Sequence, residues 1–297
     1  MKNIASITAF VFLSFSNASC QKVKVSAEEI QKFKSIEELK TLEKDTRTAQ
    51  DHRAVFTYAH YEKLLQVLSN EKFVVLPLQN FKDSINDEKV LIGMRHDVDC
   101  HPFKALEMAK MEHNYGIRAS YFFLSSAAYT GKFNANKFER NLCMKAIYLE
   151  IQNLGNEIGI HNDLISIMIE HNADPFVFNK EELTYFKSIG INIVGTAAHG
   201  SAISSKTVKN YQIFSNFAQQ NIIEYNSRYY FIGTHSLAEY GYLYEAYFIP
   251  FNRYFSESGG VWSTGGSFDK LLENLNTSKA GDRIQILTHP VWWGKTD

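Results

Sequence analysis

The stretch VLIGMRHDVDCH, residues 90–101, runs from an apolar segment directly into a cluster of side chains that bind metal ions and transfer protons. Its first half is typical of a buried β-strand. Because side chains alternate along a strand, Arg95, Asp97 and Asp99 share one face, with the two carboxylates roughly 6.6 Å apart. Aspartates at strand ends also form turns and helix caps. This stretch alone therefore leaves two interpretations open, capping and metal chemistry.

Three later apolar runs also end in a side chain that can bind a metal. They are EIGIH at 157–161, IVGTAAH at 193–199 and IQILTH at 284–289, and each ends in histidine. The carboxyl ends of parallel strands meet at one edge of a sheet, where α/β proteins place their ligands. Parallel strands would therefore bring Asp97, Asp99 and the three histidines to one rim.

Helical patterns separate these strand-like runs. After the first strand, Pro102 can open a helix that Gly116 ends. Alternating strands and helices are the signature of a parallel sheet, and about seven such units favour a barrel, closed or distorted, with its active site at the carboxyl ends of the strands. No glycine-rich phosphate loop follows the first strand, which argues against a nucleotide-binding sheet. The other expected helices are 56–68, 145–153, 180–188, 205–219 and 267–275.

The first part of the chain has the pattern of an exported protein. Residues 1–20 carry an early lysine, an apolar run at 4–15 and small residues before Cys20, as an export signal does. Cys20 is the expected lipidation site, and ordinary cleavage after Cys20 is the alternative. The apolar run is too short for a comfortable membrane span, and no later segment approaches about 20 apolar residues. We expect attachment to a membrane only through a lipid anchor, with residues 21–55 as a polar tether or loose helix.

Composition narrows the possible partners. A formal net charge of -1 gives no basic surface for nucleic acid or anionic membrane. Sixteen tyrosines and 22 phenylalanines supply rings that line a carbohydrate cleft or fill the core. Beyond Cys20 only Cys100 and Cys143 remain, so an extensive disulfide framework is excluded, and these two can pair only if the fold brings them together.

The motifs of this chain, taken in order, resemble those of the NodB-type polysaccharide deacetylase superfamily, in its branch that carries RHDVD. The matching motifs are RHDVD, ASYFFL, NEIGIHND, GTAAHG, SESGGVW and ILTHPVWW. The resemblance covers roughly residues 56–297, which we interpret as one catalytic domain. It implies a distorted (β/α)7 TIM-like barrel, a divalent metal, and hydrolysis of N-acetyl groups on a glycan.

The resemblance also assigns roles to residues at the strand ends. It makes Asp97 the catalytic base, Asp99 a metal ligand and His161 the first metal-binding histidine. His289, in the position of the last motif of the family, matches the general acid that protonates the leaving amine. Three tryptophans are candidates for stacking on a sugar ring: Trp262, Trp292 and Trp293.

The metal ligands depart from the family pattern at one position. The family binds its metal through H-x-x-x-H, but Ile165 stands four residues after His161 and cannot bind a metal. His199, at the end of the next strand, is a chemically better substitute, and Asp163 is a nearer oxygen donor. The third ligand is therefore His199 or Asp163.

A second departure concerns the base. The family carries an arginine that orients the base, and residues 196–198 offer none. Arg95 lies on the same strand face as Asp97 and is the expected replacement. The tract SESGGVW has Glu257 where the family has aspartate.

These observations favour a metal-dependent hydrolase that removes acetyl groups from an N-acetylated glycan. A carboxylate with histidines and open positions suits zinc, with iron, cobalt and manganese as alternatives. The rival hypothesis is a surface lipoprotein that keeps the fold and binds glycan without turnover. The missing second motif histidine and the missing motif arginine support that rival.

Overall fold

The computed structural model describes residues 56–134, 137–262 and 267–294. The export signal, Cys20 and the tether at 21–55 lie outside these residues, so what the sequence predicts for them stays a prediction. In the ranges that the structure describes, no helix combines the length and the apolar character that crossing a membrane requires.

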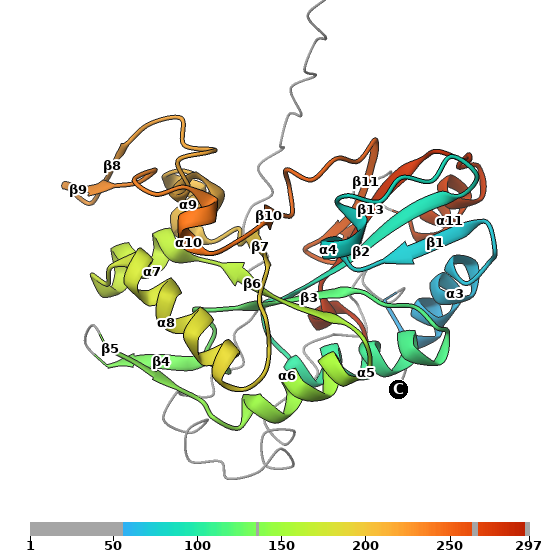
Figure 1. Cartoon of the computed structure of the whole chain (residues 1–297), viewed down its shortest axis with the longest axis horizontal. Coiled ribbons are helices and arrows are strands. Elements are labelled where there is room, and N and C mark those ends of the chain that lie inside the picture. The colour runs from blue at the N-terminus through green and yellow to red at the C-terminus, as the bar shows by residue number, and fades with distance from the viewer. Residues whose placement is uncertain (1–55, 135–136, 263–266, 295–297) are drawn as a thin grey trace, which may run out of the picture.

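A curled sheet of nine strands forms the centre of the molecule (Figure 1). The strands are β1 Phe73–Leu76, β2 Val90–Val98, β3 Ser120–Leu124, β6 Glu157–Asn162, β7 Gly195–Ala198, β10 Tyr244–Glu245, β11 Arg253–Ser258, β12 Val261–Trp262 and β13 Arg283–Thr288. Their spatial order is β10, β7, β6, β3, β2, β13, β11, β12, and β1 pairs with the first half of β2. All neighbours are parallel except β11 and β12. The expected parallel sheet is therefore confirmed.

The sheet does not close into a ring within the described residues. Its two ends, β10 and β12, do not pair with each other. A side-chain contact links β13 to the end of β10, since the amide of Gln285 donates to the backbone carbonyl of Ala246 (2.9 Å). The α/β class is thus confirmed, and the architecture is a curled half-barrel instead of a complete TIM-like ring.

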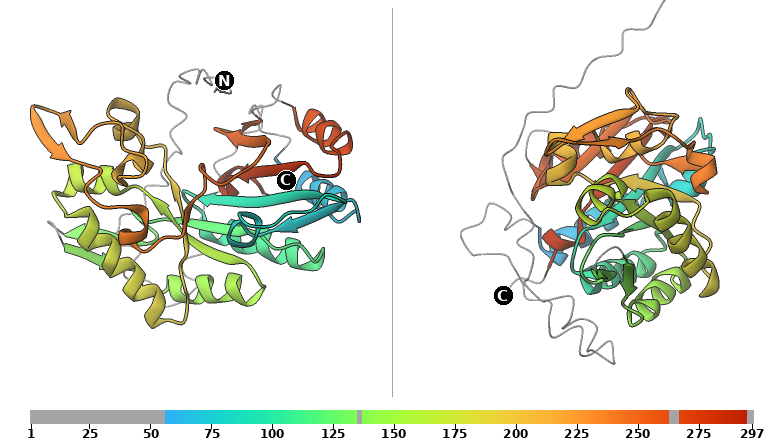
Figure 2. Two further views of the ribbon diagram at one scale, coloured as in Figure 1. Left: turned by 45° about the horizontal axis from the view of Figure 1, so that its top comes forward. Right: turned by 90° about the vertical axis from the view of Figure 1, so that its left-hand side faces the viewer.

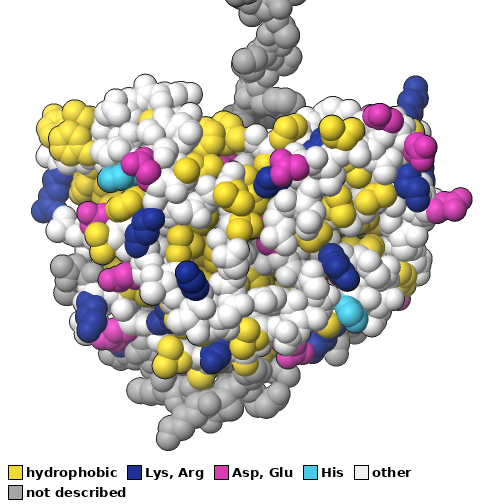
Figure 3. Space-filling model, viewed as in Figure 1, with side chains coloured by type: hydrophobic (Ala, Val, Ile, Leu, Met, Phe, Trp, Pro, Cys, Tyr) yellow, Lys and Arg dark blue, Asp and Glu magenta, His cyan; other side chains and the backbone are white. Residues whose placement is uncertain are grey.

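Helices surround the curled sheet (Figure 2). They are α3 Tyr58–Leu68, α4 Leu78–Phe81, α5 Pro102–Asn114, α6 Met144–Asn153, α7 Leu164–His171, α8 Pro175–Ser188, α9 Ala202–Lys206, α10 Leu237–Tyr240 and α11 Phe268–Asn276, with 3₁₀ turns η2 Asn210–Ile213 and η3 Pro290–Trp292. Two hairpins lie outside the sheet, β4 Gly131–Asn134 with β5 Lys137–Arg140, and β8 Ile222–Tyr225 with β9 Arg228–Phe231. On the face shown in Figure 3, side chains of both charge signs are interspersed, in keeping with the small net charge.

Local signals place several of these helices correctly. Pro102 occupies the first turn of α5, and Gly116 follows the helix with a φ of +69°, which glycine adopts without strain. The helix expected at 205–219 is wrong, because α9 ends at Lys206 and the chain continues as the short turn η2. The Asn210 side chain accepts from the backbone N–H of Ile165 (3.0 Å), which ties this segment to α7.

The odd-numbered side chains of β2 face the interior of the curl. Leu91 belongs there to a separate apolar cluster with Leu78 and Phe81 of α4. A Cβ atom at Gly93 would lie 2.8 Å from both of these side chains, so only glycine lets α4 pack into the lower interior. Above α4, Arg95 and Asp97 occupy the next two inward-facing positions of β2, below the carboxyl ends of the strands.

Candidate metal centre

Three side chains from the ends of three strands converge at the rim. Asp99 directly follows β2, His161 lies in β6, and His199 directly follows β7. Asp99 Oδ1 lies 3.2 Å from His161 Nε2 and 3.4 Å from His199 Nδ1. The two imidazole nitrogens are 3.1 Å apart. One oxygen and two nitrogen atoms, all within 4.8 Å of one another, could therefore hold a metal ion.

The ligand atoms of this triad are oriented for a cation. His161 Nδ1 lies 2.8 Å from the carbonyl oxygen of Ala197 and must donate to it, which leaves the lone pair of Nε2 facing Asp99. Asp99 Oδ1 is buried and accepts no hydrogen bond from the described residues. Burial raises the pKa of Asp99, but His199 and His161 lower it by more, so it lies well below its usual value. A buried, ionised oxygen without a hydrogen-bond donor fits a metal ligand.

The structure distinguishes the two alternatives for the third ligand. His199 belongs to the triad, and its backbone N–H donates to Asn162 (2.8 Å). The Asp163 carboxylate accepts from Ser126 (2.7 Å) at one oxygen and from Asn210 (3.0 Å) at the other. Asn210 also donates to the carbonyl of His199 (2.8 Å). Asp163 therefore holds the loop that carries His199 and does not join the triad.

Arg95 and Asp97 form a fully buried pair beside the triad. Arg95 Nε donates to Asp97 Oδ1 (2.8 Å) and a terminal Arg95 nitrogen donates to Oδ2 (2.7 Å), so the carboxylate is held at both oxygens. Asp97 Oδ2 lies 3.6 Å from His161 Nε2. Burial raises the pKa of Asp97, but Arg95 and His161 lower it by more, so the group is ionised at neutral pH. Arg95 thus stands where the shared strand face led us to expect it.

His289 approaches the same rim from the end of β13. Its Nδ1 donates to the backbone carbonyl of Glu257 (2.8 Å), and its backbone N–H donates to the Glu257 carboxylate. Burial lowers the pKa of His289, but Glu257, Asp99 and Asp97 raise it by more, so its net pKa lies above the usual value. The raised pKa favours the protonated imidazole, which can give up a proton.

No family model, curated protein or solved structure matches this chain. What the centre can do must therefore follow from its own residues. Three protein ligands leave positions open for water and a substrate oxygen. With a carboxylate on one side and a protonated imidazole nearby, the arrangement suits hydrolysis assisted by a metal.

The three tryptophans do not form the expected sugar-stacking surface. Trp262, Trp292 and Trp293 are 2%, 6% and 0% exposed and belong to the main hydrophobic core. Phe56 packs edge-on against Trp293, with ring centres 5.0 Å apart. The expectation is corrected because Trp262 in β12, Trp292 in η3 and Trp293 after it all pack into this core.

Sequence reasoning missed two residues that position the site. The sequence marks Glu257 only as a departure from the aspartate of the family in the SESGGVW tract. Its position in the order of motifs is the signal that could have identified its role. No sequence pattern points to Asn210, because its role depends on its contacts with Asp163 and His199, which are distant in the sequence. Cys100 and Cys143, the pair considered from the sequence, do not form a disulfide with each other.

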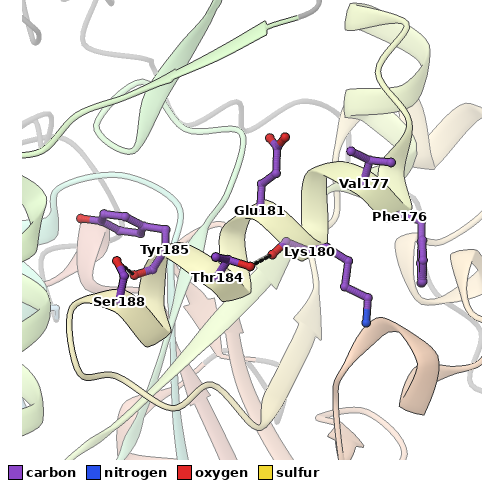
Figure 4. A pocket seen from close by; sticks show the side chains of 7 residues that line it. All are labelled: Phe176, Val177, Lys180, Glu181, Thr184, Tyr185 and Ser188. Atoms are coloured by element: carbon purple, nitrogen blue, oxygen red, sulfur yellow. Dashed lines mark hydrogen bonds between the residues drawn. The ribbon is translucent and has the colours of Figure 1, made fainter.

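A shallow hollow on α8 lies apart from the site residues (Figure 4). It is lined by Phe176, Val177, Lys180, Glu181, Thr184, Tyr185 and Ser188. Two of its hydroxyl groups donate within the helix, that of Thr184 to the carbonyl of Lys180 (2.7 Å) and that of Ser188 to the carbonyl of Tyr185 (2.7 Å). This hollow contributes nothing to the metal centre.

Proposed function

We propose that this protein is a metal-dependent hydrolase that removes acetyl groups from an N-acetylated glycan. The observation that supports it most is the convergence of Asp99, His161 and His199, in which Asp99 Oδ1 accepts no hydrogen bond from the described residues and the two imidazole nitrogens face each other at 3.1 Å. Zinc suits one carboxylate with two imidazoles, and iron, cobalt and manganese are alternatives. The glycan as substrate class comes from the order of the sequence motifs.

The residues around the triad divide the reaction between them. A divalent metal held there supplies Lewis acidity for the amide carbonyl and for a water molecule. Asp97 takes the proton of that water, and Arg95 fixes the carboxylate in position while it does so. His289 donates a proton to the nitrogen of the leaving amine, and Glu257 keeps the imidazole oriented and charged.

The test combines metal content with acetate release from N-acetylated oligosaccharides on one purified sample. Asp97→Asn should keep the metal, because Asp97 is not a ligand, and should lower turnover by about 10²–10⁴-fold, because the base is lost. Undiminished turnover in this variant would remove Asp97 from the mechanism. Stoichiometric metal without acetate release from any substrate would favour the rival function, glycan binding by a surface lipoprotein.

A further inference from the structure

Two segments beside the metal centre are aromatic and carry no charge. Residues 210–223 and 246–252 contain no Asp, Glu, Lys or Arg. Four of their aromatic side chains form what we call the aromatic platform: Tyr211, Phe217, Tyr247 and Phe248. Two of these rings are well exposed, Tyr247 at 36% and Phe248 at 48%.

The rings of the platform contact one another. Phe248 stacks on Phe217, with ring centres 3.8 Å apart and planes at 8°. Tyr211 meets the Phe248 ring edge-on at 5.0 Å. It also lies 6.4 Å from Tyr247, centre to centre. These contacts restrict the rings before any ligand binds, which lowers the entropic cost of binding.

The platform is attached to the residues that hold the metal centre. The ring of Tyr247 lies over the Arg95 guanidinium, 4.4 Å from its central carbon. The Glu245 carboxylate accepts from the backbone N–H of Tyr247 (2.8 Å) and from that of Ala198 (2.8 Å), just before His199. One end of the platform therefore lies against the partner of the catalytic base, and the other extends onto the surface.

We propose that the aromatic platform binds a neutral saccharide unit next to the one whose acetyl group lies at the metal centre. This inference rests on the proposed function and adds a preference for an extended, uncharged glycan over a single sugar. Aromatic rings offer an apolar face to the C–H face of a sugar ring. The absence of basic side chains in both segments disfavours a polyanion such as nucleic acid.

The probe is a pentamer of N-acetylglucosamine compared with the monomer. Binding is measured by calorimetry in an Asp97→Asn background, so that the sugar is not consumed. Phe248→Ala should weaken pentamer binding about tenfold, which corresponds to the loss of roughly 1.4 kcal/mol from one stacking ring. In the otherwise wild-type protein the same change should lower the ratio of kcat/KM for pentamer over monomer about tenfold.

Phe231→Ala is the matched control. Phe231 is 66% exposed on the β8–β9 hairpin, at the left-hand edge of the molecule in Figure 1, and is not one of the four rings of the platform. This variant should bind the pentamer as tightly as its parent. Equal weakening in both variants, or none in Phe248→Ala, would overturn the proposal.

Two further outcomes separate this inference from the proposed function. Binding that depends on Phe248, without acetate release by the wild type, would support the platform and reject the hydrolase. Acetate release with equal kcat/KM for monomer and pentamer would retain the hydrolase and reject the platform. Self-association of the wild type that Phe248→Ala abolishes would also reject it, in favour of a second copy of the chain.

Discussion

A cluster of histidine and carboxylate lies on each side of β2, buried on the outer side and partly exposed on the inner side, and the clusters differ in which atoms lack a partner. On the outer face, His96 bonds to Glu112 (2.6 Å) and Thr288 (2.6 Å). The hydroxyls of Tyr61 and Tyr121 donate to the same carboxylate, at 2.5 and 2.6 Å. Every oxygen and nitrogen of that histidine and carboxylate has a partner.

On the inner face the triad is open. Asp99 Oδ1 accepts no hydrogen bond from the described residues, while His161 Nε2 and His199 Nδ1 form a hydrogen bond with each other (3.1 Å). Burial of titratable groups is common to both faces and does not by itself mark a site. The unpartnered oxygen of Asp99 beside two imidazoles is the distinguishing feature, because buried polar atoms in folded proteins are almost always bonded.

The outer cluster also supports the inner one. His96 precedes Asp97 in β2, and Thr288 precedes His289 at the end of β13. His96 and Thr288 are paired in register between these two strands. Their hydrogen bond therefore fixes the relative height of the proposed base and the proposed acid. Such a network makes a firm scaffold because all of its members are satisfied.

The largest expected effect concerns the stability of the outer cluster. Glu112→Leu leaves His96, Tyr61 and Tyr121 buried without their acceptor, so unfolding in urea should require about 3–5 kcal/mol less free energy. Zinc affinity of the folded protein should change far less than when a ligand is removed. A loss of zinc as severe as that of His161→Ala would show that the outer cluster belongs to the metal site.

The next effect concerns metal affinity at the inner cluster. His161→Ala and His199→Ala should each weaken zinc binding by about 10²-fold or more, since even changes beyond the direct ligands cost about 10–100-fold. Titration against a competing chelator measures this. Asp163→Asn is the control, because an amide can keep both the Asn210 and the Ser126 contacts. Unchanged affinity in both histidine variants would mean that the triad holds no metal.

Much of this arrangement could be predicted from the sequence because it depends on local order. Alternation along β2 separates Arg95 and Asp97 from His96, and apolar runs that end in histidine mark the carboxyl ends of strands. If the strands are parallel, these ends must lie at one edge of the sheet, and no individual contact needs to be known to predict this. Pro102 and Gly116 bound their helix through backbone preferences alone.

The rest depends on contacts between distant parts of the chain. The contact between Trp293 and Phe56 joins the two ends of the described domain, and the hydrophobic periodicity of the sequence does not predict it. The open seam follows from β10, which has only two residues, Tyr244–Glu245, too few for a pattern. Asn210 appears as an ordinary polar residue until the fold places it between Asp163 and His199.

A third buried carboxylate, that of Glu157, tests the comparison between the two clusters. Of the predicted effects, its substitution should have the smallest. Glu157 accepts from Tyr244 (2.6 Å) at one oxygen, and from Ser120 (2.5 Å) and the backbone of Gln79 (3.0 Å) at the other. It resembles the outer cluster in having no unused oxygen, so it should affect stability and not metal binding. Glu157→Gln should therefore leave zinc affinity at the wild-type value.

The raised pKa of Glu157 determines whether the folded protein gains or loses stability as pH rises. Burial raises its pKa above the usual 4.5, and the three donors only partly oppose this. Between 4.5 and the raised value the folded state binds more protons than the unfolded state, so stability falls as pH rises through that window. The contribution is fully present below 4.5 and is lost above the folded pKa. Glu157→Gln removes this loss, so the stability of the variant relative to wild type should improve as pH rises through that window.

Urea unfolding at several pH values, in chelator, measures that gap. Glu224→Gln, on the exposed β8–β9 hairpin, controls for the loss of one negative charge and should show no such trend. A gap for Glu157→Gln that stays constant with pH would mean that this carboxylate titrates alike in the folded and unfolded chain. Satisfied hydrogen bonds would then offset its burial completely, and a buried carboxylate with every oxygen bonded would cost the fold nothing on ionisation. The open oxygen of Asp99 would in that case be the feature that separates the inner cluster from both of the others.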